Sequence, residues 1–278
     1  MNPEQYCLDK AAPAGSNLYY CSLFYKSPQK RKLHAIFALQ QELLDTISEC
    51  QDAGVARIKL QWWCEEITRL FASEARHPVS LELQQLLPEI QFDQGQLLYL
   101  VNAIEHQISP RPSGSIQSLL DFFINGRGII WRLAAELCGA KDKDLITQAA
   151  TIGGLNSCLE YFQSSAQHLQ RGYCPYPQIE LDKYGLSHDD LMQAGKLSAV
   201  RQLRDELYNT IFSGLEQSLL RLSGMDNRQI LFAIIQANIA QANCKLMQKQ
   251  TGDLMQTPPS ITPLRKLWIA WRTNKTCR

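Results

Sequence analysis

The sequence has almost no net charge, because 28 Lys and Arg residues are balanced by 27 Asp and Glu residues. A protein with a net charge of +1 has no general field that would draw the whole molecule to nucleic acid or to an anionic membrane. We therefore expect no nucleic-acid partner. Any contact with a charged surface must depend on a local segment.

The sequence also leads us to expect neither a targeting segment nor a membrane-spanning one. Residues 1–16 contain Glu4 and Asp9, lack an apolar core and are not rich in Arg, unlike a secretory or organellar signal. No stretch approaches the roughly 18 uncharged apolar residues that a helix needs to cross a bilayer. The sequence predicts a cytoplasmic protein that does not span a membrane.

The nine cysteines do not form a recognisable pattern. Their number is odd, they are scattered along the chain, and no pair is spaced as C-x-x-C, which argues against both a disulfide framework and a zinc site. We expect reduced thiols that serve mostly as small core residues.

What the sequence does contain is helical periodicity and enough apolar residues, 45%, for a large core. No segment shows sustained strand alternation, and no polar linker divides the 278 residues. The sequence therefore predicts an all-α protein with a single domain over residues 1–278. The expected helices cover residues 33–47, 55–71, 93–107, 115–137, 143–169, 197–222 and 228–249.

The C-terminal tail, residues 261–278, differs from the rest of the chain. It contains Trp268 and Trp271, several basic residues and no acidic residue. This composition is typical of segments that lie on a membrane surface or against a partner. It leaves open a peripheral contact with the inner face of a membrane.

Several motifs in the first 200 residues occur in an order that resembles the squalene/phytoene synthase family. They are Ser16–Phe24, Ala35–Asp45, Ala56–Ile67 with His77–Val79, Phe122–Gly139, and Gln170–Gly172 with Pro177. The resemblance implies an isoprenoid-synthase-like helical bundle around a central apolar cavity. It also implies two aspartate-rich helical motifs that face each other and hold Mg²⁺ and a prenyl diphosphate.

The resemblance fails at the residues that would hold the metal. The family's metal-facing aspartates correspond here to Leu44, Ser48, Ser164 and His168. Leu cannot ligate a metal, Ser hydroxyls are poor ligands for a dication, and neutral imidazole is mismatched to the hard Mg²⁺ ion. We therefore expect no catalytic residues, no metal site and no cofactor, with Mg²⁺ required only if the protein is an enzyme after all.

Two alternatives concern other polar residues of the same helices. Glu42, Asp45 and Glu49 lie on one arc of a helix and could form a displaced metal site, although a helix face that makes ion pairs with Lys and Arg is the stronger interpretation. His168 could act as a base or a replacement ligand, although a hydrogen-bonded interior or loop-edge histidine is the stronger interpretation.

Candidate ligand-binding residues are Tyr19, Tyr20, Asp45, Arg132 and Arg171. Aromatic side chains could line a tunnel for an isoprenoid tail, together with Tyr25, Trp62 and Trp63, or could simply belong to the core. The two arginines could bind an anion or pair with structural carboxylates.

The changed motifs resemble the branch of the family represented by the mitochondrial complex I assembly factors, as does the Leu-x-x-x-Trp-Arg ending at Trp271 and Arg272. The leading hypothesis is a non-catalytic family member that binds a prenyl lipid or a protein partner. The alternative is an active prenyltransferase that condenses prenyl diphosphates in isoprenoid biosynthesis.

Overall fold

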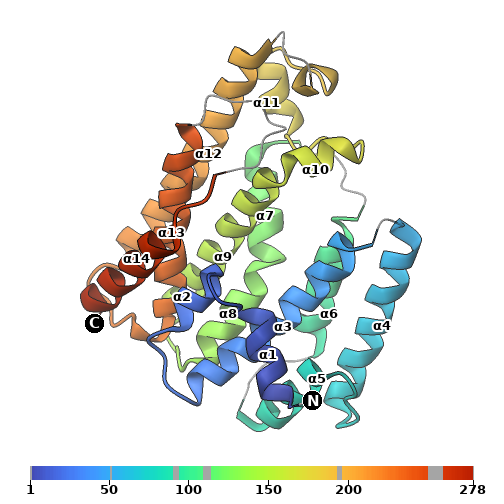
Figure 1. Ribbon diagram of the computed structural model, residues 1–278, viewed down its shortest axis with the longest axis vertical. Helices are drawn as coiled ribbons and strands as arrows, with labels where there is room; N and C mark the ends of the chain where they lie inside the picture. The colour runs from blue at the N-terminus through green and yellow to red at the C-terminus, as the bar shows by residue number, and fades with distance from the viewer. Residues whose placement is uncertain are drawn as a thin grey trace.

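Figure 1 shows the computed structural model of the chain, which describes residues 2–50, 52–89, 94–108, 114–192, 196–249 and 259–277. All regular structure within these ranges is helical, and no strand occurs in them. The predicted all-α class is therefore confirmed. The longer helices run roughly side by side, and one hydrophobic core cluster extends from Cys7 on α1 to Cys277, directly after α14.

The α-helices have the following bounds. They are α1 (Pro3–Ala11), α2 (Asn17–Ser22), α3 (Gln29–Ser48), α4 (Ala53–Phe71), α5 (Pro78–Leu86), α6 (Gln94–Glu105), α7 (Ile116–Asn125), α8 (Gly128–Leu137), α9 (Lys143–Gln163), α10 (Ser165–Gln170), α11 (Gln178–Lys183), α12 (Leu197–Arg221), α13 (Leu231–Gln248) and α14 (Pro263–Thr276).

Two of the predicted helices are broken in the structure. The expected helix 115–137 is divided into α7 and α8 at Gly126, where a Cβ would lie 2.9 Å from the Cβ of Ala103 on α6. The expected helix 143–169 is divided into α9 and α10 at Ser164, which caps both. The short helices α1, α2, α5 and α11 were not predicted, because six to nine residues show too little periodicity.

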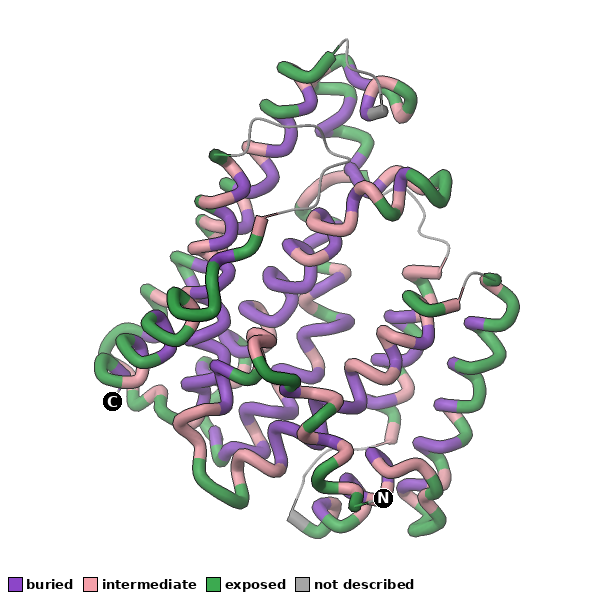
Figure 2. The backbone as a smooth tube through the Cα atoms, viewed as in Figure 1, coloured by how far each residue is buried: buried purple, intermediate pink, exposed green. Residues whose placement is uncertain are grey.

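Helix α9 is the centre of the bundle and packs against α7, α8, α12 and α13. Figure 2 shows it as a largely buried rod. Two adjacent glycines allow its neighbours to approach closely, since Gly153 lies against the side chain of Trp131 and Gly154 against the backbone of Ile124. This close packing holds α7 and α8 against α9 beside the cavity described below.

One segment of the described residues could cross a membrane, judged by its length and composition alone. It is Arg228–Gln248, which comprises α13 and the turn before it. In the bundle, 72% of an 18-residue stretch of this segment is buried. The helix packs against α2, α9, α12 and α14. Such burial is typical of a core helix, and we assign α13 to the core.

The cysteines behave as the sequence predicts. All nine are free, six are buried and three are half-buried. Burial raises the pKa of Cys7, Cys138 and Cys244 to about 12, so these thiols remain protonated at neutral pH.

Buried His34 on α3 makes the stability of the protein depend on pH. Burial lowers its pKa to about 4, and its Nε2 lies 3.1 Å from Ser22 Oγ. The unfolded chain protonates this residue near pH 6.5, so the unfolded state holds the extra proton between about pH 6.5 and pH 4. We expect the contribution of His34 to lower the free energy of unfolding by about 3 kcal/mol as the pH falls through this window.

Chemical denaturation at a series of pH values measures this effect. The His34→Gln variant keeps a hydrogen-bonding group at this position but cannot titrate. Between pH 6.5 and pH 4 its free energy of unfolding should therefore fall less steeply with pH, by the slope that corresponds to about one proton. Equal pH dependence in the two proteins would contradict this assignment.

Candidate functional site

A cavity of about 670 Å³ lies between α3, α8, α9 and α10. Ser16, just before α2, and the first residues of α2 also line it, as do residues of α4, residues 107 and 108 after α6, and Gln236 of α13. We call it the central cavity. Ser16 caps α2 by accepting a hydrogen bond from the Tyr19 backbone N–H, which fixes how the chain crosses this wall.

All four positions that the sequence resemblance matches to aspartates, Leu44, Ser48, Ser164 and His168, line the central cavity. Leu44 and Ser48 are one turn apart on α3, whereas Ser164 and His168 lie at the junction of α9 and α10. This is the arrangement that helical register predicts for residues at i and i+4 on two facing segments.

The wall of the cavity is apolar in one part and polar in another. Apolar side chains include Leu18, Phe37, Leu44, Ile47 and Trp131. The polar part is a chain of hydrogen bonds from α13 through α9 to the start of α8. Gln236 Nε2 donates to Asn156 Oδ1 over 2.5 Å, Asn156 Nδ2 donates to Glu160 Oε1 over 2.8 Å, and Arg127 Nη2 donates to Glu160 Oε2 over 2.7 Å.

Three nearly inaccessible residues of this wall carry polar atoms that have no hydrogen-bond partner in the described part of the chain. They are Gln40, Arg127 and Trp131, each less than a tenth exposed. The atoms are an acceptor, Gln40 Oε1, and two donors, Arg127 Nε–H and Trp131 Nε1–H. A buried polar group without a partner is costly, and each of these residues lines the cavity, so a bound molecule that reached these covered atoms would relieve that cost.

Asp45 and Glu160 are the carboxylates of the cavity wall among the described residues. Asp45 Oδ2 lies 2.7 Å from Lys10 Nζ, and Glu160 Oε2 lies 2.7 Å from Arg127 Nη2. Each carboxylate therefore already has a cation of the protein as its partner, and Asp45 shares that partner with Glu42.

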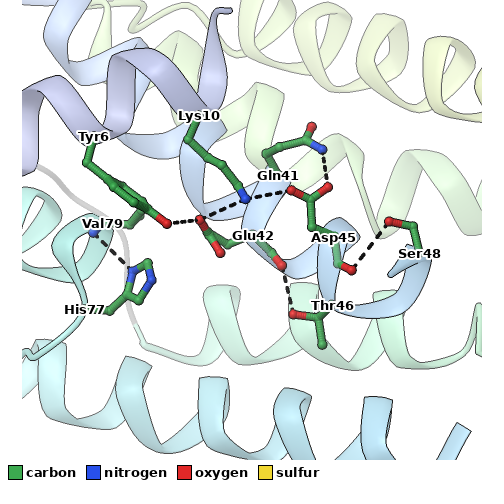
Figure 3. Close-up of polar contacts among 9 residues, drawn as sticks. All are labelled: Tyr6, Lys10, Gln41, Glu42, Asp45, Thr46, Ser48, His77 and Val79. Atoms are coloured by element: carbon green, nitrogen blue, oxygen red, sulfur yellow. Dashed lines mark hydrogen bonds and ion pairs between the residues drawn. The ribbon is translucent and has the colours of Figure 1, made fainter. Parts of the chain in front are cut away.

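The position of Lys10 decides between the two interpretations of the acidic residues on α3, a displaced metal site or a set of ion pairs. Figure 3 shows its ammonium between Glu42 and Asp45, 3.1 and 2.7 Å away, while the Tyr6 hydroxyl donates to Glu42 over 2.6 Å. Burial lowers the pKa of Lys10, but the hydrogen bonds with Asp45 and Glu42 outweigh it and raise the pKa above its usual value. The ion-pair interpretation is confirmed for Glu42 and Asp45.

Removing the ammonium should destabilise the protein, because two partly buried carboxylates would lose their counter-charge. We expect Lys10→Met to lower the free energy of unfolding at neutral pH by about 1–2 kcal/mol. Lys59→Met is the matched control, since exposed Lys59 lines the same small pocket around Lys10 and Trp63. Urea denaturation measures both variants, and equal losses would contradict the role of Lys10.

These residues do not fit a resident Mg²⁺ ion. The four cavity positions supply one alkyl group, two hydroxyls and one imidazole, and the two nearby carboxylates are paired. No group of three or more His, Cys, Asp or Glu side chains that could hold a metal occurs in the described ranges. Mg²⁺ prefers six oxygen ligands in octahedral geometry, which this donor set does not provide.

His168 is a neutral residue in this site. Burial, with a smaller effect of the Arg171 cation, lowers its pKa to about 4. Its ring packs against the Tyr161 ring with the centroids 4.5 Å apart. The contact seen is thus between rings, where the sequence interpretation expected a hydrogen bond.

The predicted ligand-binding residues are only partly brought together. Asp45 and Arg171 line the central cavity, and Arg171 Nη2 donates to the Ser48 backbone carbonyl over 3.2 Å. Arg171 thus joins the ends of α10 and α3, which neither sequence interpretation of this residue foresaw. Arg132 lies outside the cavity, because it follows Arg127 by five residues and therefore faces another side of α8.

The predicted aromatic tunnel is not formed by the residues named for it. Tyr19 and Tyr20 pack edge to face with ring centroids 5.2 Å apart. Neither tyrosine lines the cavity, whereas the three residues before them, 16–18, do. Tyr25 is a structural residue whose hydroxyl binds the backbone of Gln229 and Phe232. Trp62 and Trp63 line the small pocket around Lys10.

Several residues of the cavity were missed by sequence reasoning. They are Phe37, Gln40, Arg127, Trp131, Asn156 and Gln236. One signal was present, since polar residues such as Gln40, Asn156 and Gln236 interrupt otherwise apolar helical stripes.

The bundle and its interior cavity define an all-α protein of the isoprenoid synthase fold. The sequence model of the squalene/phytoene synthase family matches residues 11–266. The chain belongs to this family.

Curated relatives are proteins described as NADH dehydrogenase (ubiquinone) complex I, assembly factor 6. The protein of Rattus norvegicus is 22% identical over 275 residues, covering 96% of this chain and 81% of that protein. The protein of Mus musculus is 21% identical over 199 residues, covering 71% of this chain and 60% of that protein. The matched region thus spans less than two thirds of the mouse protein.

Solved structures with the same fold are squalene and dehydrosqualene synthases. The squalene synthase HpnC from Alicyclobacillus acidocaldarius has a TM-score of 0.75 and 17% identity, covering 90% of this chain and 94% of that one. A dehydrosqualene synthase in complex with ligand has a TM-score of 0.82 and 14% identity, covering 98% and 95%. At these identities the likeness concerns the fold alone.

Proposed function

We propose that this protein is a non-catalytic, cytoplasmic member of the squalene/phytoene synthase family. In this proposal it binds an uncharged prenyl lipid in the central cavity and acts with a protein partner in the assembly of a respiratory complex. The observation that carries the proposal is the set Leu44, Ser48, Ser164 and His168 at the cavity wall, none of which is a carboxylate.

The charges around the cavity support a neutral ligand. A prenyl diphosphate brings about three negative charges, which the enzyme relatives would balance through metal ions bound by aspartates. Here Arg127 is already paired with Glu160, Lys10 is paired with Glu42 and Asp45, and His168 is neutral at pH 7. Arg171 is the one cation of the wall, among the described residues, that is not paired with a carboxylate. A diphosphate would therefore meet about one positive charge for its roughly three negative ones, too little for cleavage of its C–O bond.

The polar atoms of the wall support a ligand that carries a carbonyl or hydroxyl oxygen. Arg127 Nε–H and Trp131 Nε1–H can donate to such an oxygen, and Gln40 Oε1 can accept from a hydroxyl. Leu44 and the other apolar side chains provide surface for a hydrocarbon tail. A quinone-like molecule or a prenyl alcohol has both features.

The assembly role is supported by the curated relatives, which are named for complex I assembly. A protein partner follows from that role. The relatives are only 21–22% identical over the regions compared, so the partner itself has to be found by experiment.

The second candidate function is an active prenyltransferase of isoprenoid biosynthesis. One observation favours it: the fold matches squalene and dehydrosqualene synthases over 90% and 98% of the chain. An enzyme of this kind would need Mg²⁺ ligands other than the four positions discussed above.

An activity assay distinguishes the two functions. Purified protein is incubated with farnesyl or geranylgeranyl diphosphate and Mg²⁺, with and without NADPH, and released pyrophosphate is measured. We expect no release above the rate without protein, because the developing charge on the leaving group has no metal to balance it. Mg²⁺-dependent release would establish the enzyme function instead.

A further inference from the structure

Helix α14 carries apolar side chains on two opposite sides. Ile269, Ala270 and Thr273 are buried where the helix packs on α13 and α2. Leu264, Leu267, Trp268 and Trp271 are 79%, 44%, 53% and 45% exposed. Because residues three, four and seven apart share one face of a helix, these four side chains form a continuous stripe that points away from the bundle. We call it the α14 stripe.

Positive charge is concentrated on the same helix. α14 contains four cations, Arg265, Lys266, Arg272 and Lys275, and no carboxylate, although the whole chain has a net charge of only +1. None of the four forms an ion pair with a residue that the structure describes. Arg265, Arg272 and Lys275 are exposed, so their charges are available to an external anion.

Each tryptophan of the stripe has a cation beside its ring. The Arg272 guanidinium lies 5.2 Å from the Trp268 ring centroid, and the Lys275 ammonium lies 4.2 Å from the Trp271 ring centroid. An amphipathic indole next to a long cationic side chain suits the boundary of a bilayer, where the ring lies at headgroup level and the cation meets phosphate groups.

We propose that the α14 stripe docks on the surface of an anionic lipid membrane. Large apolar side chains that are bordered by cations, without any acidic residue, complement a surface that is apolar inside and negatively charged at its headgroups. Helix α14 runs along the outside of the bundle beside α13, so the stripe can meet a flat surface (Figure 1).

Docking would also place the central cavity near the lipid. Lys266 Nζ donates to the Gly15 backbone carbonyl over 3.3 Å, and the residues that follow, 16–18, line the cavity. The docking surface stands on α14 alone, however, and goes beyond the function proposed above. It does not depend on which ligand the cavity holds.

Vesicle flotation tests the proposal with the full chain. Vesicles made of equal parts phosphatidylglycerol and phosphatidylcholine are compared with vesicles of phosphatidylcholine only. Each exposed cation is worth about fivefold in partitioning, so we expect about 100-fold stronger binding to the anionic vesicles for three cations, with loss of this preference at high salt.

Variants identify the surface that is responsible. The variant Leu264→Ser/Trp268→Ser/Trp271→Ser should lose vesicle binding, and Arg265→Gln/Arg272→Gln/Lys275→Gln should bind both kinds of vesicle equally weakly. The matched control is Ile58→Ser/Leu220→Ser, which removes side chains that are 71% and 68% exposed elsewhere and should bind as the unmodified protein does. Circular dichroism establishes that each variant is folded.

Three outcomes would overturn the proposal. They are the absence of binding by the unmodified protein, equal binding to neutral and anionic vesicles, and unchanged binding by the folded stripe variant. A fourth result would assign the α14 stripe to a protein interface instead. In that case the unmodified protein does not bind vesicles but captures a protein, and the stripe variant fails to capture it.

Discussion

Replacing Leu44, Ser48, Ser164 and His168 together by aspartate should create Mg²⁺-dependent binding of a prenyl diphosphate. All four positions line the central cavity, from α3 and from the junction of α9 and α10. Carboxylates one turn apart on two facing segments could bridge Mg²⁺ to the phosphates, an interaction worth several kcal/mol. We expect the affinity for farnesyl diphosphate with Mg²⁺ to increase about 100- to 1,000-fold.

The matched control has asparagine at the same four positions, which provides similar shape without charge. It should gain little affinity, because amides do not supply the anionic oxygens that Mg²⁺ prefers. Titration calorimetry with and without Mg²⁺ measures the effect.

Thermal unfolding provides a second measurement. Without Mg²⁺, the aspartate variant should be less stable than the asparagine variant, because four unpaired carboxylates repel one another. Its stability should recover when Mg²⁺ is added. A folded aspartate variant without any gain would show that the helical register is misread.

Substituting both glycines of α9, Gly153→Ala/Gly154→Ala, should destabilise the bundle strongly. A Cβ at Gly153 would lie 2.7 Å from the Trp131 Cβ, and one at Gly154 would lie 2.6 Å from the Ile124 backbone nitrogen. Because the second contact is with backbone, α7 would have to move away from α9. We expect the free energy of unfolding to fall by about 4 kcal/mol, even after the gain in helix propensity from alanine.

Gly214→Ala on α12 is the control for this substitution. Its new Cβ would lie 3.1 Å from the two terminal methyl groups of Leu155, which can shift. We expect no loss of stability or a small gain, because alanine favours the helix. If the α9 double variant in urea denaturation is as stable as Gly214→Ala, then the helices around the cavity are not held together by close contact at these glycines.

The sequence could predict the all-α class from local periodicity, and the placement of the four family positions from the resemblance together with helical register. Leu44 and Ser48 are one turn apart whatever surrounds α3, and the same holds for Ser164 and His168 after α9. The break at Gly126 was not predicted, because it depends on contact with Ala103, far away in the sequence.

The remaining parts of the site depend on contacts between distant residues. Lys10 on α1 forms ion pairs with Glu42 and Asp45 on α3. The spacing of residues within α3 could not indicate this partner. Arg127 lines the cavity at the start of α8, just after the break in the chain, whereas the family resemblance directed attention to Arg132. Periodicity shows which residues share a face of one helix, but the partner of that face is set by tertiary packing.

The most direct test of the proposed function is a comparison of two ligands that differ only in their head group. Calorimetric titration of the unmodified protein with farnesol and with farnesyl diphosphate, each with and without Mg²⁺, compares a hydroxyl with a diphosphate on the same hydrocarbon tail. We expect farnesol to bind more tightly, with an affinity that Mg²⁺ does not change, because the cavity offers apolar surface and neutral hydrogen-bonding groups. Tighter binding of farnesyl diphosphate that requires Mg²⁺ would contradict the proposed function.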